Sequence, residues 1–367
     1  MSGAYSVLML SAGASAIPLA WLTEKFGPAK IIAITGFLTA LSMILTSRIT
    51  ELWQLYVAFG FLQGIAIGGT IAITSGLTAR WFVKRRGLAL GMVSAAIGIG
   101  TLIGPPISER LITNYGWSQA SLVIGLFTGI AIIVAGLFLR SNPESMGLKA
   151  YGAENNTITT GVKGNDTTKK SKAPVVTLGS AIHTTPIWIF TSLFFLLNIC
   201  VQVVMVHVAN YTTDLGFNPF TAATIVSVIG IGSIIGRLVM GAVADRIGSV
   251  NSLIFTSLLI TVSLIWLIFS HQLWMLYLFA VFFSFAYGGE VPQMPLLISK
   301  FYGLGAVISL TALTSAGIRA GGALGSWVGG EVFDLTHSYT IAFIITSVVA
   351  LATLGVALVI KRIKPKT

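Results

Sequence analysis

Charged side chains are rare in this sequence: Asp, Glu, Lys and Arg make up 9% of 367 residues, against roughly a quarter in an average soluble domain. That scarcity excludes an ordinary water-solvated surface. The single cysteine, Cys200, excludes an intramolecular disulfide and a cysteine-based metal site. The four histidines show no metal-ligand spacing. No carboxylate pair or activated nucleophile stands at catalytic spacing, so we expect neither an enzyme nor a cofactor.

Hydrophobic residues instead make up 55% of the chain, with 40 glycines among them. Abundant glycine is typical of helices that pack closely in lipid. A membrane-crossing helix needs about 20 mainly apolar residues, and its backbone groups must be satisfied within the helix. We therefore predict an all-α, polytopic membrane protein in contact with the lipid bilayer, with about eleven transmembrane helices. The predicted spans are 3–22, 30–47, 53–78, 87–111, 118–139, 185–207, 220–243, 249–270, 273–297, 304–329 and 339–360.

The formal net charge of +11 comes from Lys and Arg in alternate loops between these spans. Positive charge marks the cytoplasmic side of a membrane protein, so we predict a multi-pass protein of the cell membrane with a cytoplasmic C-terminus. Nucleic acid is not an expected partner, since no basic stripe carries aromatic stacking residues. The basic loop residues are Lys25, Lys30, Arg80, Lys84, Arg85, Arg86, Arg246 and Lys300, followed by Lys361, Arg362, Lys364 and Lys366.

The region 141–183 is polar and includes the basic run Lys169, Lys170 and Lys172. Its composition is typical of a flexible linker. We predict an N-terminal helical half at 1–140, a cytoplasmic linker at 141–183 and a C-terminal helical half at 184–367. A tether and a regulatory segment are both open interpretations of the linker.

An acid-base-glycine loop occurs once in each half. Glu24, Lys25 and Gly27 recur at one constant offset as Asp245, Arg246 and Gly248. Two halves related by a parallel repeat are a known transporter architecture. An acid at a helix end can hold neighbouring helices through charge and dipole contacts, so both loops are predicted gating elements.

This repeated loop resembles the signature of the major facilitator superfamily. The segments 80–91 and 115–117 and the pattern around Arg237 and Asp245 are similar to its monocarboxylate transporter and oxalate/formate antiporter branch. The resemblance covers essentially the whole chain and implies a two-half bundle that works by alternating access. The signature loop normally follows the second helix but here follows the first, which implies that the family's first helix is absent from this sequence. A natural eleven-helix carrier, a misplaced start and a truncation are all open.

Arg237 is the leading candidate for substrate binding. It lies about two turns before Asp245, on a helical face shared with Ser233. An ionisable residue at mid-membrane is a functional hypothesis by default, and a guanidinium can hold a carboxylate through two hydrogen bonds. The resemblance implies the same role for an arginine on the eighth family helix. The alternative is an arginine whose side chain extends toward the cytoplasm or braces the signature loop.

Arg319 is a second candidate, on a polar stripe of the penultimate helix. If both arginines face one cavity, a substrate with two carboxylates becomes plausible. The alternative is a structural arginine paired with Glu290 or with helix carbonyls. The softer candidates for lining the cavity are Gln63, Asn198 and Gln202, although such residues also hold helices together.

Glu290 is the acidic residue nearest to mid-membrane. Burial in lipid disfavours an ionised carboxyl group, so Glu290 either pairs with an arginine in the empty cavity or carries a coupled proton. His207, near an outer helix end, is a candidate for proton coupling or gating. Both have a purely structural alternative.

These residues predict a monomeric secondary transporter of small organic anions such as lactate or pyruvate, coupled to a proton or a counter-anion. A dicarboxylate or oxalate exchanger is one alternative, and a transport-inactive membrane sensor is another. A channel is disfavoured because it would show a repeated pore lining.

Overall fold

The computed structural model describes residues 2–153 and 178–363, and these residues form helices with one isolated bridge between Phe82 and Tyr151. The helices of the first half are α1 (Ser2–Phe26), α2 (Pro28–Thr46), α3 (Leu52–Leu55), the π-helix η1 (Tyr56–Leu62), α4 (Gln63–Gly68), α5 (Thr70–Trp81) and α6 (Arg86–Leu137). The 3₁₀-helix η2 (Pro143–Met146) and α7 (Leu178–Ala181) flank the linker. The helices of the second half are α8 (Thr185–Asp214), α9 (Pro219–Ile247), α10 (Ser249–Ile268), α11 (Leu273–Glu290), α12 (Gln293–Tyr302), α13 (Val307–Thr336) and α14 (Tyr339–Arg362).

Within the described residues, eleven segments are long and apolar enough to cross a membrane, which confirms the predicted all-α fold and span number. Two of these segments, Arg86–Gly104 and Arg110–Leu137, belong to α6. Helical geometry is interrupted within the second of them at Gly116, where φ is 79°. The span Leu52–Trp81 is also divided, because α3, η1, α4 and α5 follow one another within it. The sequence therefore predicts the spans well and their internal breaks poorly.

The glycines of the repeated loop have a structural reason. Gly27 and Gly248 have φ values of 88° and 84°, a region that residues with a Cβ rarely adopt. Each glycine is the sole residue between two consecutive helices, α1 and α2 in one half and α9 and α10 in the other. The backbone reverses within one residue, so the acid and base before each glycine stand at a helix end.

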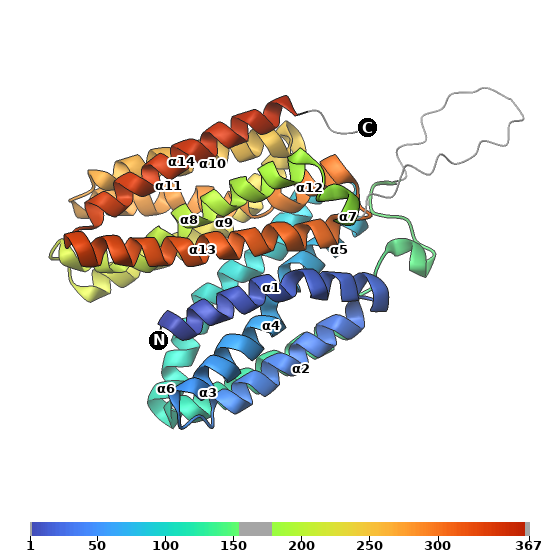
Figure 1. Cartoon of the computed structure of the whole chain (residues 1–367), viewed down its shortest axis with the longest axis horizontal. Coiled ribbons are helices and arrows are strands. Elements are labelled where there is room, and N and C mark those ends of the chain that lie inside the picture. Colours follow the sequence, from blue (N-terminus) through green and yellow to red (C-terminus); the bar gives the residue numbers. More distant parts are fainter. Residues whose placement is uncertain (1, 154–177, 364–367) are drawn as a thin grey trace, which may run out of the picture.

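The helices form two bundles, α1–α6 and α8–α14, that lie side by side (Figure 1). The distance between the two bundles changes along their length. At one end, which we name the basic end, lie the loops with Lys25, Arg80–Arg86, Arg246 and Lys300 and the end of α14. At the other end, which we name the far end, α8 finishes at Asp214 and α13 at Thr336. The bundles meet at the basic end and diverge toward the far end (Figure 1).

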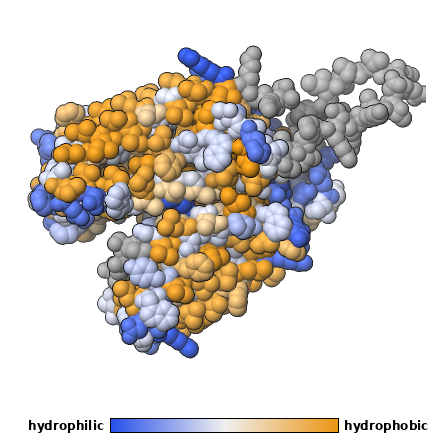
Figure 2. Space-filling view, viewed as in Figure 1, coloured by the Kyte–Doolittle hydropathy of each residue, from blue (hydrophilic) through white to orange (hydrophobic). Residues whose placement is uncertain are grey.

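Glycines on α6 show where the two halves touch. A Cβ added to Gly87 or Gly91 would collide with the backbone carbonyls of Gly241 or Arg237 on α9. Farther along α6, no described atom lies within 4 Å of a Cβ built on Gly100 or Gly104. The α6–α9 contact therefore ends part-way along α6. Apolar residues cover the flanks, and a hollow with hydrophilic atoms at its floor separates the two halves (Figure 2).

The beginning of the predicted linker packs on the first half and is not a free tether. Tyr151 donates its backbone N–H to the Trp81 carbonyl at 2.9 Å. Its own carbonyl accepts the backbone N–H groups of Val83 and Lys84 at 2.9 and 3.1 Å. Composition alone does not reveal such pairing, because it uses backbone groups. The basic run from Lys169 to Lys172 lies outside the described residues.

Candidate functional site

A cavity of about 320 Å³ lies between the two halves. Its charged and amide-bearing lining residues are Asn198, Gln202, Arg237, Glu290 and Arg319, joined by the Ser315 hydroxyl and the phenols of Tyr5 and Tyr287. Its apolar lining residues are Met9, Ile71, Ile97, Phe194, Val201, Val291, Met294 and Ile318. Four of the six predicted substrate-binding residues therefore lie in one place, although α8, α9 and α13 supply them.

Arg237 is held inside the protein and not against lipid, with an exposed fraction of 1%. Its Nη1 donates a hydrogen bond of 2.6 Å to the Ser233 hydroxyl, one helical turn earlier on α9. The guanidinium carbon lies 5.2 Å from the centre of the Tyr287 ring, within the range of a cation–π contact. Nε has no hydrogen-bond partner among the described residues. Arg237 is therefore oriented by Ser233 and Tyr287, and its Nε–H group is available to donate a hydrogen bond to a ligand.

Glu290 stands at a break within the span Leu273–Tyr302. It is the last residue of α11, and the chain turns at Val291 and Pro292 before α12 begins at Gln293. Broken helices are typical of binding sites in transporters. The Glu290 side chain is 6% exposed, and its Oε2 has no hydrogen-bond partner in the described part of the chain.

Arg319 lines the same cavity from α13, one turn after Ser315. Its Nη1 lies 3.4 Å from the sulfur of Met9 on α1. Among the described residues, neither Arg319 nor Arg237 has a carboxylate within the 4.0 Å that defines an ion pair. The pairing of Glu290 with an arginine, one of the predicted alternatives, is absent from this arrangement. The three ionisable groups thus share the cavity without neutralising one another by direct contact.

Three predicted residues do not line the cavity: Ser233, which holds Arg237 in place, and Gln63 and His207. Gln63 begins α4, and its Oε1 has no partner in the described structure. His207 lies near the far end of α8, where its Nε2 is 3.3 Å from the Ser326 carbonyl oxygen. Its ring centre is 5.4 Å from that of Tyr339. His207 therefore joins an aromatic cluster at the far end and does not line the cavity.

The cavity also contains residues that were not predicted to lie there, notably Tyr5, Met9 and Tyr287. Tyr5 and Met9 are four residues apart, so they share one face of α1. Tyr287 precedes Glu290 by three residues and shares its face of α11. The sequence signal for these residues was therefore their spacing of three or four residues from a polar residue on the same helix. It was weak because aromatic and thioether side chains are equally common in packed cores.

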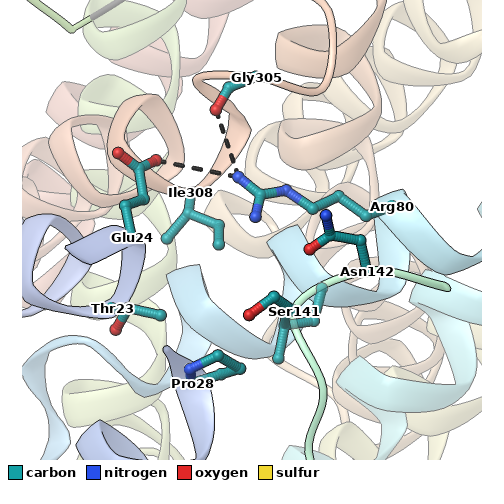
Figure 3. A pocket seen from close by; sticks show the side chains of 9 residues that line it. Thr23, Glu24, Pro28, Arg80, Ser141, Asn142, Gly305 and Ile308 are labelled. Carbon is teal, nitrogen blue, oxygen red and sulfur yellow. Dashed lines mark hydrogen bonds and ion pairs between the residues drawn. The ribbon is translucent and has the colours of Figure 1, made fainter. Parts of the chain in front are cut away.

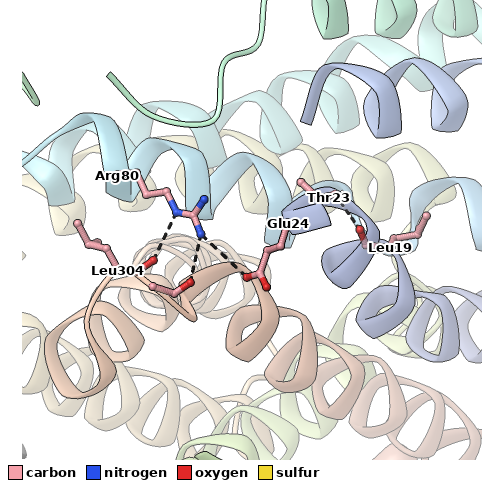
Figure 4. A network of polar contacts seen from close by, with 6 residues as sticks. Leu19, Thr23, Glu24, Arg80 and Leu304 are labelled. Carbon is pink, nitrogen blue, oxygen red and sulfur yellow. Dashed lines mark hydrogen bonds and ion pairs between the residues drawn. The ribbon is translucent and has the colours of Figure 1, made fainter. Parts of the chain in front are cut away.

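Beside the first signature loop, Arg80 at the end of α5 joins the two halves. The Arg80 Nε and Nη2 donate to the carbonyl oxygens of Leu304 and Gly305, in the loop before α13, at 3.4 and 3.2 Å. Glu24 lies on the other side of the guanidinium, with its Oε1 4.0 Å from Nη2 (Figure 4). A cleft of about 310 Å³ adjoins these groups, with Thr23, Ser141 and Asn142 also on its wall (Figure 3). Lys25 instead lies over the Trp21 ring, 5.0 Å from its centre.

The second signature loop joins the halves through a helix cap. The Asp245 carboxylate accepts the backbone N–H groups of Gly87 and Leu88 at 2.7 and 3.0 Å. These are among the first N–H groups of α6, which have no partner inside the helix. Arg246 is exposed. Both loops therefore connect the halves at the basic end. Asp245 makes the connection directly, whereas Glu24 lies beside Arg80, which makes it.

The family model for the Major Facilitator Superfamily matches residues 1–260 and 208–367, which together cover the chain. The chain belongs to the Major Facilitator Superfamily. It is a multi-pass membrane transporter with a small-molecule substrate and is not an enzyme.

The superfamily relatives include monocarboxylate transporters. Monocarboxylate transporter 13 of Rattus norvegicus is 29% identical over 337 residues, covering 91% of this chain and 74% of the relative. Monocarboxylate transporter 11 of Homo sapiens is 25% identical over 355 residues, covering 93% and 70%. The chain is therefore similar to monocarboxylate transporters along most of its length. The proton:xylose symporter XylE has the same fold, with a TM-score of 0.75 at 13% identity and coverage of 96% of this chain and 84% of XylE.

Proposed function

We propose that this transporter carries small organic anions across the cell membrane by alternating access, with Arg237 as the carboxylate-binding group. One observation carries the proposal: the Arg237 guanidinium lines the central cavity, and no carboxylate of the described residues lies within 4.0 Å of it. A buried charge without a partner is costly. A substrate carboxylate supplies that partner through charge-assisted hydrogen bonds.

In this proposal the basic end faces the cytoplasm, because Lys and Arg concentrate there. The C-terminus is then cytoplasmic as well. The halves are in contact at the cytoplasmic end and apart at the outer end, which is an outward-facing arrangement. Transport requires the bundles 1–140 and 184–367 to rock, so that the seam between α6 and α9 opens while the outer ends close. The working unit is one monomer.

Charge must be balanced as the anion crosses. A proton on Glu290 is one means, since this carboxyl group shares the cavity with Arg237 and burial disfavours its ionised form. Exchange for a second anion is the other means, with Arg237 charged in both directions. His207 is the weaker candidate for a proton carrier, because it lies outside the cavity.

Arg319 supports a second candidate function, the exchange of dicarboxylates. Its guanidinium lines the same cavity as Arg237 and likewise lacks a carboxylate partner within 4.0 Å in the described chain. Two cations in one cavity fit a substrate with two carboxylates. Uptake of oxalate that exceeds uptake of pyruvate, and that depends equally on both arginines, would favour this candidate.

Purified protein in liposomes tests the proposal through labelled pyruvate, lactate and oxalate, with and without a pH gradient. We expect saturable uptake and counterflow by the wild type. Arg237→Gln should lower uptake on the order of 100-fold, since removing one partner of a buried charged pair costs about 2–5 kcal/mol. Arg362→Gln, at the exposed end of α14, is the matched control. Unchanged uptake by Arg237→Gln would refute the assigned carboxylate site.

A further inference from the structure

A proline breaks the helix that carries Glu290. Pro292 has no backbone N–H to donate to the Gly288 carbonyl, and a proline ring crowds the turn before it. The Gly288 carbonyl instead accepts the Val291 N–H at 3.4 Å, and α11 ends at Glu290. The last carbonyl groups of a helix have no partner inside it. The position of Glu290 in the cavity therefore depends on the contacts that hold this break.

The side chain of Gln293 holds the break in place. It is fully buried, with an exposed fraction of 0%. Its Nε2 donates to the Gly289 carbonyl at 3.2 Å and to the Met240 carbonyl of α9 at 3.3 Å. Met240 lies one turn after Arg237 on α9, and Gly289 directly precedes Glu290. One amide group thus connects the helix of the cavity's arginine to the residue before the cavity's carboxyl group.

Glycine contacts fix α9 against α11 before the break. A Cβ added to Gly236 would collide with the Phe285 carbonyl, and one added to Gly288 would collide with the Ser233 carbonyl. The two backbones are in direct contact, so these helices cannot slide past each other without a clash. The break is therefore the point at which the carboxyl group could move, and the Gln293 amide restrains it there.

Glu290 and Arg237 would gain from pairing with each other. The Glu290 Oε2 and the Arg237 Nε have no hydrogen-bond partner among the described residues, and both side chains line the cavity. A buried charge without a partner is costly, so the ion pair would form wherever the backbone allowed it. That pair would occupy the guanidinium that a substrate carboxylate needs. Arg319, the second cation of the cavity, lies on α13, and neither bond of Gln293 reaches that helix.

We propose that Gln293 is a positioning residue for the carboxylate site: it pins the break between α11 and α12 to α9 and so keeps Glu290 from forming an ion pair with Arg237. This inference rests on the proposed function, because it takes Arg237 as the carboxylate-binding group. It adds the restraint that keeps this group free for the substrate. Without the amide, Glu290 becomes an internal competitor of the substrate. Such competition raises KM and leaves the maximal rate almost unchanged.

Exchange of labelled pyruvate and of labelled oxalate in liposomes at constant pH tests this role. Gln293→Met keeps the length of the side chain and removes both hydrogen bonds. We expect KM to rise on the order of tenfold, which corresponds to about 1.4 kcal/mol in favour of the internal pair, with the maximal rate almost unchanged. Gln272→Met, at the exposed N-cap of α11, is the matched control and should retain the wild-type KM.

The double variant of Gln293→Met with Glu290→Gln separates positioning from a merely structural role. A neutral amide cannot form the ion pair, so the KM of the double variant should be close to that of Glu290→Gln alone. A KM that stays raised would show that Gln293 does not act through Glu290 and would overturn the proposal.

The two cations of the cavity are separated by a second background. In Arg319→Gln, the further substitution Gln293→Met should still raise KM. Disappearance of the effect in this background would mean that the freed Glu290 pairs with Arg319, which would overturn the assignment to Arg237.

The outcomes also distinguish this inference from the proposed function. An unchanged KM in Gln293→Met would overturn the role of Gln293 and leave a carboxylate transporter in place. Failure of the wild type to exchange pyruvate, lactate or oxalate would overturn the proposed function and this inference with it. If Gln293→Met does not insert as monodisperse protein, Gln293→Asn takes its place under the same comparisons, because its shorter amide cannot span both carbonyl groups.

Discussion

The Asp245 carboxylate at the end of α9 caps the N-terminus of α6, accepting the Gly87 N–H at 2.7 Å across the boundary between the halves. Glu24, its counterpart in the repeat, caps no helix among the described residues and lies 4.0 Å from Arg80. Arg80 in turn donates to two carbonyl oxygens before α13. The repeated sequence thus makes two different contacts, and both hold the basic end closed.

Asp245→Asn should shift the protein away from the closed basic end. The amide keeps one acceptor oxygen and loses the negative charge that favours a helix N-terminus. With a loss of about 1 kcal/mol, typical of a helix cap, the ratio of closed to open should fall about fivefold. Spin labels at Val83 and Lys300, which are exposed on opposite halves, would show a longer distance population. Asp214→Asn, at the exposed far end of α8, should leave the distances unchanged.

Arg80 should matter more than Glu24 for the same closure. Arg80→Met removes both hydrogen bonds to the Leu304 and Gly305 carbonyls, whereas Glu24→Gln removes only a partly exposed ion pair of small energy. We expect the spin-label distances to lengthen clearly in Arg80→Met and by less than half as much in Glu24→Gln. Arg48→Gln at the far end is the control. Equal effects would show that Arg80 acts through Glu24 and not through the carbonyls.

Gly91→Ala should hinder closure by steric conflict. A Cβ at this position would meet the backbone carbonyl of Arg237, and backbone atoms cannot rotate away as a flexible side chain can. The α6–α9 seam must then widen, so substrate uptake should fall at least tenfold while the protein still inserts and remains monodisperse. Gly355→Ala on α14, where no described atom lies within 4 Å of the added Cβ, should retain wild-type uptake. Normal uptake by Gly91→Ala would mean that the seam tolerates this widening.

The spans and the family could be predicted because their signals are local. An apolar run of sufficient length can only be a helix in lipid, and the glycine of each signature loop is required by its backbone angle. Arg237 could be predicted for a similar reason, since a charged residue within an apolar span is a functional candidate by default. These inferences depend on single segments and not on how segments meet.

The remainder of the site depends on contacts between segments. Gln63 and Asn198 are both amides within apolar spans, yet only Asn198 lines the cavity. The distinction follows from the rotation of each helix in the bundle, which one sequence does not specify. The bonds of Tyr151 to the loop after α5 are likewise invisible in composition, because backbone groups make them.

Glu290→Gln tests whether this carboxyl group carries the coupled proton. The amide is neutral at every pH and so resembles the protonated carboxyl group permanently. If the anion crosses together with a proton on Glu290, wild-type uptake should fall as the pH on the uptake side rises, because the protonated fraction falls. Glu290→Gln should then lose both this pH dependence and accumulation driven by a pH gradient, while exchange of anion for anion persists. Uptake measured from pH 5.5 to 8.5, alongside Glu331→Gln at the end of α13 as a matched control, would decide the point. An unchanged pH profile in Glu290→Gln would remove this residue from the coupling mechanism and leave anion exchange as the means of charge balance.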